Sequence, residues 1–424
     1  MKRALKHLLS NKTFYIFLVL TLFMFPDALF QQGDKARTAI VTTVGIDKVE
    51  NEEYEVSVLT VIPKGASQLN ANLELFSAKG KSIVKALDTI GDSLGKNIGL
   101  SHCDCIILAK SVLEEDVCKV LDYFIRNANM SNNASVIVSK DTSKELLEAS
   151  KSANNLYDLT LKDIVKYSDD DNYNTGMNIE SFYKDYYSFD SVSIIPLLEL
   201  EESDNSSGSS SGSGGGESSN TSSGSSSSSS GGESNSSSSK SGESKNVKNN
   251  GDSVVLINGK YENTLSNEEN YIYNLLSPHT KHENITVTNV TDELVTNASE
   301  TYRVVDKYNY RQVEYKNNKF IVNYYSYLVL KLEEVVTDHY ELKTIENLEE
   351  YLTPCVKQKM YENVMTKFNT SVSEIKRTNQ DILKVGREFY AYHTKEWQEY
   401  VKDNKDNYLE NIEFNLHIDF AFKI

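Results

Sequence analysis

The sequence predicts a multidomain α+β protein in which mixed or antiparallel β-sheets pack against helices. Two observations carry this prediction. Strand-like and helix-like hydrophobic patterns alternate along the chain, and a Ser/Gly-rich tract divides them into two halves. At 424 residues the chain is long enough for two or three domains. We place an N-terminal α+β domain at 34–200, a disordered linker at 203–252, and a C-terminal α+β region, combining middle and C-terminal domains, at 253–424.

A basic segment followed by an apolar one opens the chain. Four Lys or Arg residues precede the run Phe14–Phe25, in which only Tyr15 and Thr21 are polar. This order is typical of an export signal. No clean cleavage site follows, so we predict that 1–30 is a signal or an uncleaved anchor, although the run is shorter than the roughly 20 residues that span a bilayer. Basic residues on its N-terminal side would place the rest of the chain on the extracytoplasmic face of the membrane.

The N-terminal half alternates predicted strands with predicted helices. Apolar residues recur at helical spacing in the helices and alternate or run continuously in the strands. The expected strands are 39–46, 54–62, 105–109 and 135–139, and the expected helices are 83–94, 117–124 and one that opens at 141–145. We therefore expect a mixed sheet covered by helices.

The tract between the halves is almost entirely Ser and Gly with a few charged residues. Such a composition buries too little apolar surface to offset the entropy of ordering, so we predict a disordered spacer. As a flexible coil, about 50 residues have an r.m.s. span of roughly 40 Å. No large side chain in the tract offers an anchor for a partner.

The C-terminal half restarts with strand and helix patterns. Ser266 and Glu269 have the spacing of a capping box, which predicts a helix through Leu276. Three segments look like strands of one antiparallel sheet, and two further segments look like a long helix and a final half-buried strand. The three sheet segments are 285–290, 311–315 and 319–332; the helix runs from Pro354, with Thr353 as its cap, to Val385 with a break near Thr378 and Asn379; and the last strand is 412–424.

Composition excludes one class of partner. The formal net charge is −17, with 61 acidic residues against 44 Lys and Arg. Because binding to phosphates requires a basic face, nucleic acid is not an expected partner.

The segment Ser101–Cys105 holds the densest set of reactive side chains. His102, Cys103 and Cys105 could bind zinc, or Cys105 could act as a nucleophile. A zinc site needs a second pair of ligands, and a thiol nucleophile needs a base that nothing in the sequence marks. The other cysteines, at 118 and 355, stand alone, and alternation would put Cys103 and Cys105 on one face of a strand. We expect Cys105 to be a small core residue and His102 to cap or hydrogen-bond at the junction of helix and strand, and we predict no catalytic residue, no metal site and no cofactor.

Glycines and single carboxylates elsewhere give weaker signals. Gly91, Gly95 and Gly99 lie in and after a helix rather than after a strand, so they indicate the end of a helix and not a phosphate loop. Asp47 and Asp381 have no paired carboxylate that would suggest acid–base chemistry.

Two further stretches have ordinary interpretations. Asp169–Asp171 lacks the spacing of a calcium-binding loop and is interpreted as a solvated loop. The stretch Tyr302–Tyr327 is rich in tyrosine, which favours protein interfaces, but alternation in strands explains it equally well.

Several segments, taken in order, resemble the Ger(x)C family, the C subunits of spore germinant receptors. ARTAIVTTVGIDKVENEEYEVSVLTVIPKG, at 36–65, is similar to the family's opening strand pair with its GID motif. The helix at 80–90 and the LSHCDCIILAKSVLEEDVCKVLDYFIRN segment at 100–127 resemble the next elements. VVLINGKYENTLSNEENY, at 254–271, resembles the opening of the second region, with Leu256 and Asn263 departing from its phenylalanine and glycine. NQDILKVGREFYAYHTKEW, at 379–397, resembles a D-x-[LF]-x-[LI]-G motif followed by a tryptophan.

The resemblance implies a non-enzymatic, membrane-attached subunit of a germinant receptor complex in the spore inner membrane. Such a subunit contributes to nutrient-triggered germination by associating with a permease-like subunit and another membrane subunit. The resemblance leaves open whether this subunit binds a small-molecule germinant. The chain departs from the family pattern in two ways. No cysteine precedes Cys103, so the family's lipid-bearing cysteine is absent and a transmembrane anchor would replace it. The Ser/Gly tract is an addition to the family pattern.

Two alternatives remain open from the sequence. One is an exported adhesion or binding module carried on a Ser/Gly stalk. The other is an exported thiol or hydrolytic enzyme that uses His102 and Cys105.

Overall fold

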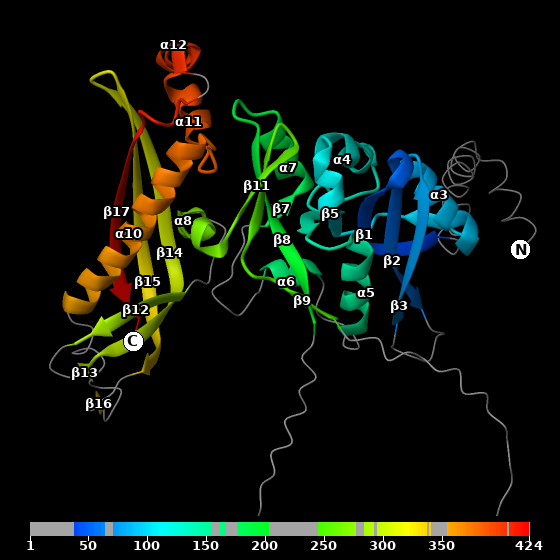
Figure 1. The fold of residues 1–424 in the computed structure, drawn as a ribbon, viewed down its shortest axis with the longest axis horizontal. Helices are drawn as coiled ribbons and strands as arrows, with labels where there is room; N and C mark the ends of the chain where they lie inside the picture. The colour runs from blue at the N-terminus through cyan, green and yellow to red at the C-terminus, as the bar shows by residue number, and fades with distance from the viewer. Residues whose placement is uncertain are drawn as a thin grey trace, which may run out of the picture.

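The computed structural model describes residues 38–63, 71–153, 161–166, 176–202, 245–276, 284–291, 295–336, 339–340, 354–404 and 407–423. The predicted anchor at 1–30, the aspartates at 169–171, the predicted cap Thr353 and the Ser/Gly tract as far as residue 244 lie outside these ranges. Figure 1 shows two large β-sheets, with helices packed against both.

The larger sheet is mixed, with parallel strands at its centre and antiparallel strands on both sides. Its main order is β11-β10-β8-β6-β5-β1-β2-β3, in which β1, β5, β6 and β8 are parallel neighbours. The strands are β1 (Thr38–Val49), β2 (Glu53–Pro63), β3 (Ala71–Gly80), β4 (Asn97–Gly99), β5 (Cys105–Ala109), β6 (Ser135–Ser139), β7 (Met177–Asn178), β8 (Val192–Glu202), β9 (Lys245–Lys248), β10 (Ser253–Ile257) and β11 (Lys260–Leu265). The helices that precede the second sheet along the chain are α3 (Ile83–Leu94), α4 (Val117–Arg126), α5 (Ser143–Ala153), α6 (Leu161–Lys166), α7 (Ile179–Tyr186) and α8 (Asn267–Leu276), with 3₁₀ turns at Glu50–Glu52 and Lys110–Glu114.

Helix ends follow from local side chains. The Ser82 hydroxyl accepts the Lys85 N–H at the start of α3, and the Asp116 carboxylate accepts the Cys118 N–H at the start of α4. Gly95 ends α3 in the left-handed conformation at φ 60°, which glycine adopts without a Cβ clash. The helix-ending role predicted for the glycine series therefore belongs to Gly95.

Helices cover both faces of the larger sheet, and each face has its own hydrophobic cluster. Side chains of α3, α4 and α7 pack on one face, around residues such as Leu121 and Phe182. Side chains of α5 and α6 pack on the other, around Leu147 and Leu161. The α+β prediction is confirmed, and its sheet is mixed as expected.

The larger sheet continues across the Ser/Gly tract. Its strand β8 pairs with β9 and β10, which follow the tract, and β10 and β11 form a hairpin turned by Asn258 and Gly259. Strand β9 begins at Lys245, before the predicted linker end at 252. The predicted start of a separate region at 253 also differs from the structure, because backbone hydrogen bonds of β10 and β11 complete the first sheet. Sequence patterns show strands but not their partners, which accounts for the difference.

The second sheet has the order β12-β14-β15-β17. Its strands are β12 (Asn284–Val290), β14 (Ala298–Lys316), β15 (Lys319–Val336) and β17 (Glu413–Phe422), with a small pair formed by β13 (Val295–Thr296) and β16 (His339–Tyr340). The helices are α10 (Pro354–Thr378), α11 (Val385–Tyr392) and α12 (Thr394–Asn404). The first three strands are antiparallel as predicted, whereas β17 runs parallel to β15.

The predicted long helix is correct in its start and its break but not in its length. Helix α10 ends at Thr378, and Asn379 has φ 50°, a left-handed conformation that stops the helix. Val385 instead begins α11. The predicted capping box is confirmed, since Ser266 N–H donates to Glu269 Oε2 at 2.7 Å and Glu269 N–H donates to Ser266 Oγ at 3.4 Å.

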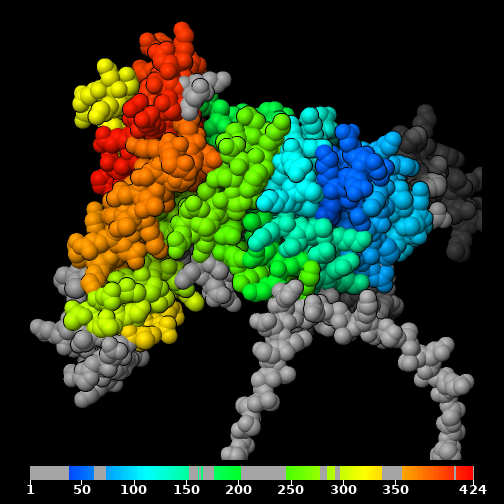
Figure 2. Space-filling model, viewed as in Figure 1, coloured from blue at the N-terminus to red at the C-terminus, as the bar shows by residue number. Residues whose placement is uncertain are grey.

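One hydrophobic cluster joins the two halves. It contains Val192 and Val255 of the larger sheet, Leu275 of α8, and residues of α10 and the second sheet such as Phe368 and Leu328. In Figure 2 the surface of α10, in orange, meets the green surface of α8 and β11, and α8 and α10 are in contact. Within the described residues no helix is long and apolar enough to span a bilayer.

Candidate functional site

The segment at 101–105 separates its reactive side chains rather than gathering them. His102 is exposed in a turn, whereas Cys103 and Cys105 are buried. Cys103 belongs to the cluster under α3 and α4, and Cys105 belongs to the cluster under α5, on the other face of the sheet. The prediction that both cysteines share a face is wrong because Cys103 precedes the strand: its N–H closes a turn onto Leu100 O at 3.0 Å, and β5 begins only at Cys105.

Burial keeps two of the thiols protonated. It raises the pKa of Cys103 to about 12, and the Cys103 thiol donates to the Cys105 carbonyl at 3.4 Å. Burial also raises the pKa of Cys118. Since the thiolate is the reactive form, these side chains behave as small apolar residues of the core.

Asp47 fixes the start of α5 against the end of β1. Its carboxylate accepts the Ser143 N–H at 2.8 Å, the Ser143 hydroxyl at 2.5 Å and the Lys144 N–H at 3.3 Å. Gly45, two residues earlier, leaves space for this helix, because a Cβ there would lie 2.6 Å from Ser143 Oγ. Burial raises the pKa of Asp47, and the hydrogen bonds from Ser143 and Lys144 partly oppose that rise. The GID motif thus joins a strand to a helix that begins nearly 100 residues later.

Replacing Asp47 with alanine is expected to lower the free energy of unfolding by about 1–2 kcal/mol, because the N-terminal N–H groups of α5 lose their acceptor. Urea denaturation of the two proteins measures the difference. Asp47→Asn is the matched control, since it keeps one side-chain oxygen and should lose less. Equal midpoints for wild type and Asp47→Ala would show that the cap contributes nothing.

Asp381 plays the same part at α11. It is fully buried and accepts the Val385 N–H at 2.9 Å and the Gly386 N–H at 2.7 Å. A Cβ on Gly386 would lie 3.0 Å from Asp381 Oδ2 and 3.1 Å from Trp397 Cζ2. The D-x-x-x-x-G spacing and the later tryptophan therefore describe one packing unit, in which a buried carboxylate caps a helix and a glycine admits the indole.

A charged joint, formed by Asp185, Lys384 and Arg387, connects the halves beside this unit. The buried carboxylate of Asp185, on α7, accepts Lys384 Nζ at 2.5 Å and Arg387 Nη2 at 3.1 Å. Phe189, just after α7, packs edge-on against Trp397 with 6.1 Å between ring centroids. Sequence reasoning missed the joint because the partners lie about 200 residues apart and no local pattern links them.

Two carboxylates near the joint favour protonation. Burial, and then the nearby Asp190 carboxylate, raise the pKa of Asp381 to about 6, while Arg311 opposes the rise. Burial also raises the pKa of Asp190. Both groups would otherwise ionise near 3.8.

This shift predicts a pH dependence of folding. Because the folded pKa of Asp381 is higher than its ordinary value, the bound proton stabilises the folded state. That contribution is fully present below about pH 4 and is lost as the pH rises through about 6. Relative to Asp381→Asn, the wild-type free energy of unfolding should therefore fall over this range, as measured by urea denaturation at a series of pH values. A difference that stays constant with pH would contradict the assignment.

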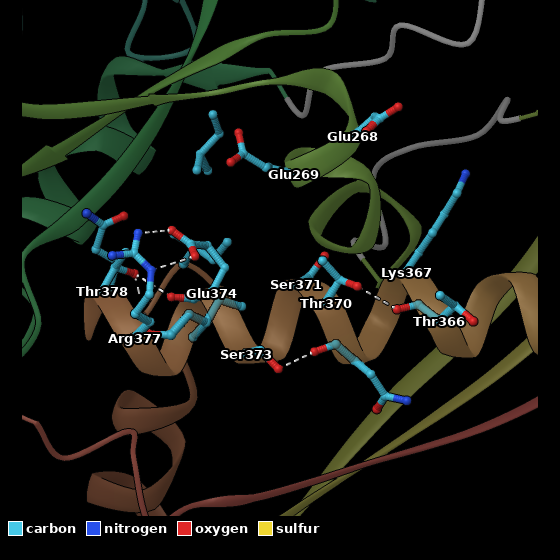
Figure 3. Close-up of a pocket in the computed structure, with 15 residues that line it drawn as sticks. Glu268, Glu269, Thr366, Lys367, Thr370, Ser371, Ser373, Glu374, Arg377 and Thr378 are labelled. Atoms are coloured by element: carbon cyan, nitrogen blue, oxygen red, sulfur yellow. Dashed lines mark hydrogen bonds and ion pairs between the residues drawn. The ribbon is translucent and has the colours of Figure 1, made fainter.

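A groove with a volume of about 710 Å³ lies between α8 and α10. Figure 3 shows the Glu374–Arg377 pair at one end of the groove and Lys367 toward the other. These charges already have partners: Glu374 and Arg377 lie 2.5 Å apart, and Lys367 Nζ lies 3.9 Å from the centre of the Tyr271 ring. The groove shows no converging set of free charges that would identify a ligand.

The tyrosines of 302–327 divide between the two sides of the second sheet. Tyr302 and Tyr324 are buried on the side that faces α10, while Tyr308, Tyr310 and Tyr327 are exposed on the other. Alternation in strands and an exposed aromatic surface are therefore both present.

Profiles of two protein families match the chain on either side of the Ser/Gly tract. Residues 35–200 match the spore germination protein N-terminal domain, and residues 252–423 match the family described as spore germination B3/GerAC like, C-terminal. The crystal structure of the GerBC protein is similar over 90% of this chain and 97% of that chain, with 11% sequence identity and a TM-score of 0.47. A comparison with curated proteins finds no significant match.

The two matched regions contain both of the glycine–aspartate units described above, at 45–47 and 381–386. They also contain, in the same order, all the segments on which the resemblance rests. The resemblance is confirmed, and the chain belongs to the Ger(x)C family of spore germination proteins, the germinant receptor C subunits.

Proposed function

We propose that this chain is a non-enzymatic, membrane-attached subunit of a germinant receptor complex, which contributes to nutrient-triggered germination through protein–protein association. Its partners would be a permease-like subunit and another membrane subunit. The observation that carries the proposal is the match of two spore germination domains, in order, over nearly all of the chain outside the Ser/Gly tract.

The roles of the motif residues support a non-enzymatic function. Asp47 and Asp381 use their carboxylates to cap helices, and the glycines beside them admit close packing. His102 is exposed while Cys105 is buried on the face that α5 covers, so the pair proposed for a thiol enzyme is not assembled. A catalytic thiol needs a base within hydrogen-bond reach.

Membrane attachment rests on the sequence at 1–30. The basic residues and the apolar run Phe14–Phe25 would hold the N-terminus in the membrane and leave both sheets on its outer side, in the spore inner membrane. Without a lipid-bearing cysteine, this segment is the proposed point of attachment.

Co-purification from spore membranes tests the proposal. The full-length chain, tagged at its C-terminus and expressed in its native host, should fractionate with the membrane and bring down the permease-like and the second membrane subunit after solubilisation in mild detergent. A variant lacking residues 2–25 is the matched control and should lose membrane association. A wild-type chain that is found alone in solubilised spore membranes would contradict the proposal.

A further inference from the structure

The outward side of the second sheet carries a cluster that we name the tyrosine face: Tyr308, Tyr310, Tyr325, Tyr327 and His417. In the strand register Tyr310 lies opposite Tyr325, which lies opposite His417, and Tyr308 lies opposite Tyr327. The rings of Tyr310 and Tyr325 stack with centroids 4.5 Å apart, and those of Tyr325 and His417 stack at 4.7 Å. A continuous aromatic row therefore crosses three strands.

This face is exposed where an ordinary sheet would be polar. Alternate positions of β15, such as Val322 and Leu328, are buried on the side of α10, so their neighbours point away from the core. Tyr308 and Tyr310 are 60% and 63% exposed, and Tyr327 is 41% exposed. Aromatic side chains held in place by stacking give a large contact area with little further loss of conformational entropy, which favours a role in binding.

A hollow of about 450 Å³ extends from the tyrosine face to the edge of the sheet. Four consecutive residues of β17, 416–419, line it, together with Tyr361 of α10. Side chains alternate between the two faces of a strand, so a hollow lined by four consecutive residues must open along the strand's edge. Within the described part of the chain β17 pairs only with β15, so this edge has backbone groups available to a further strand.

The charges around the tyrosine face are mainly acidic. Asp306, Glu314, Glu413 and Asp419 occupy outward positions of the same strands, and none of them takes part in an ion pair between described residues. Among the basic residues of these strands, Arg303 and Lys331 lie beside Glu333, at 3.8 Å and 3.3 Å, while Lys316 and Lys319 lie opposite each other at the hairpin end, away from Asp306 and Asp419. An aromatic surface with an acidic border complements a cationic partner, because Lys and Arg interact with both carboxylates and aromatic rings.

We propose that the tyrosine face and the β17 edge dock an extended, Arg- or Lys-bearing segment of a partner membrane subunit. This inference rests on the proposed receptor-subunit function and names the surface that it uses. The partner's backbone pairs with β17 as an added strand, and its basic side chains lie over the tyrosine rings and beside Asp306 and Asp419. The aromatic rows fix the position of the partner segment, and the carboxylates favour a segment with positive charge.

The test uses the full-length chain co-expressed with the permease-like subunit and the second membrane subunit and purified in detergent. Tyr310→Ser/Tyr325→Ser should reduce the co-purified partner by about tenfold or more, the loss typical of central aromatic contacts. Asp306→Lys/Asp419→Lys should also reduce it and should weaken its dependence on salt. Tyr390→Ser/Tyr392→Ser is the matched control, since these α11 tyrosines are 45% and 74% exposed and lie outside the tyrosine face; it should retain the partner.

The outcomes separate the docking surface from the receptor role. The docking surface is supported if the tyrosine variant loses the partner while its melting temperature is unchanged and the control variant retains the partner. If the partner co-purifies with the wild type and equally well with the tyrosine and charge variants, the proposed docking surface is wrong and the receptor role stands. If these variants instead abolish self-association of the chain and leave partner binding intact, the proposed docking surface is also wrong, because the tyrosine face would then bind a second copy. A wild-type chain that binds no partner would remove both proposals.

Discussion

Replacing Trp397 with alanine is expected to lower the free energy of unfolding by about 3–5 kcal/mol, because truncation of a large buried aromatic side chain leaves a cavity. The indole is fully buried. It stacks on Phe389 at 5.2 Å and meets Phe320 and Tyr408 edge-on at 5.1 Å and 5.5 Å. The cavity would lie where α11, α12 and β15 meet. Urea denaturation followed by circular dichroism measures the loss.

Trp397→Phe is the matched control for this prediction. The indole Nε1 has no hydrogen-bond partner in the described part of the chain, so phenylalanine removes no hydrogen bond and keeps most of the aromatic contact. We expect its cost to be clearly smaller than that of alanine. If both variants were as stable as wild type, the tryptophan would not be the centre of this cluster.

Replacing Asp381 with alanine is expected to cost about 3 kcal/mol at neutral pH, because two buried N–H groups lose their acceptor. The Val385 and Gly386 amides have no route to water at this position, since the residues around them are buried. Hydrogen exchange of these two amides is the sharpest measurement: it should quicken in Asp381→Ala far more than the exchange of amides in α3. In Asp381→Asn, which keeps one acceptor, the exchange rates of these two amides should lie between those of the wild type and Asp381→Ala. Unchanged protection at the start of α11 would contradict the capping role.

Both predictions concern the same corner of the molecule, where the two halves meet. Phe189 extends the aromatic cluster from the N-terminal half, and Asp185 holds Lys384 and Arg387 across the joint. Loosening this corner should therefore affect how the halves are held together as well as the stability of α11. The proposed docking surface lies on the outward side of the second sheet, so its position relative to the larger sheet depends on this joint.

Local patterns in the sequence predicted the elements whose residues lie close together along the chain. The helix at 83–94, the strand at 105–109 and the capping box at Ser266 depend on spacing and on nearby caps, and the structure contains all three. The resemblance to the Ger(x)C family also came from local motifs, and the family profiles confirm it.

Features that depend on distant residues were not predictable from those patterns. Nothing local shows that β10 pairs with β8 across the Ser/Gly tract, or that β17 runs parallel to β15. Asp47 looked like an isolated carboxylate because the amide groups that it caps belong to a helix far along the chain. The amides that Asp381 caps are only four and five residues away, but its burial depends on the surrounding fold. The shared face predicted for Cys103 and Cys105 failed because strand periodicity was extended back to Cys103, two residues before the strand begins.

The receptor-subunit role is tested most directly by complementation of a deletion in the native host. Spores that lack this chain should lose germination in response to at least one nutrient. The wild-type chain and the His102→Ala/Cys105→Ala variant should both restore the response when present at equal levels in the spore membrane. Normal germination of the deletion spores with every nutrient tested would contradict a receptor role, and restoration by wild type but not by the variant would contradict a non-enzymatic one.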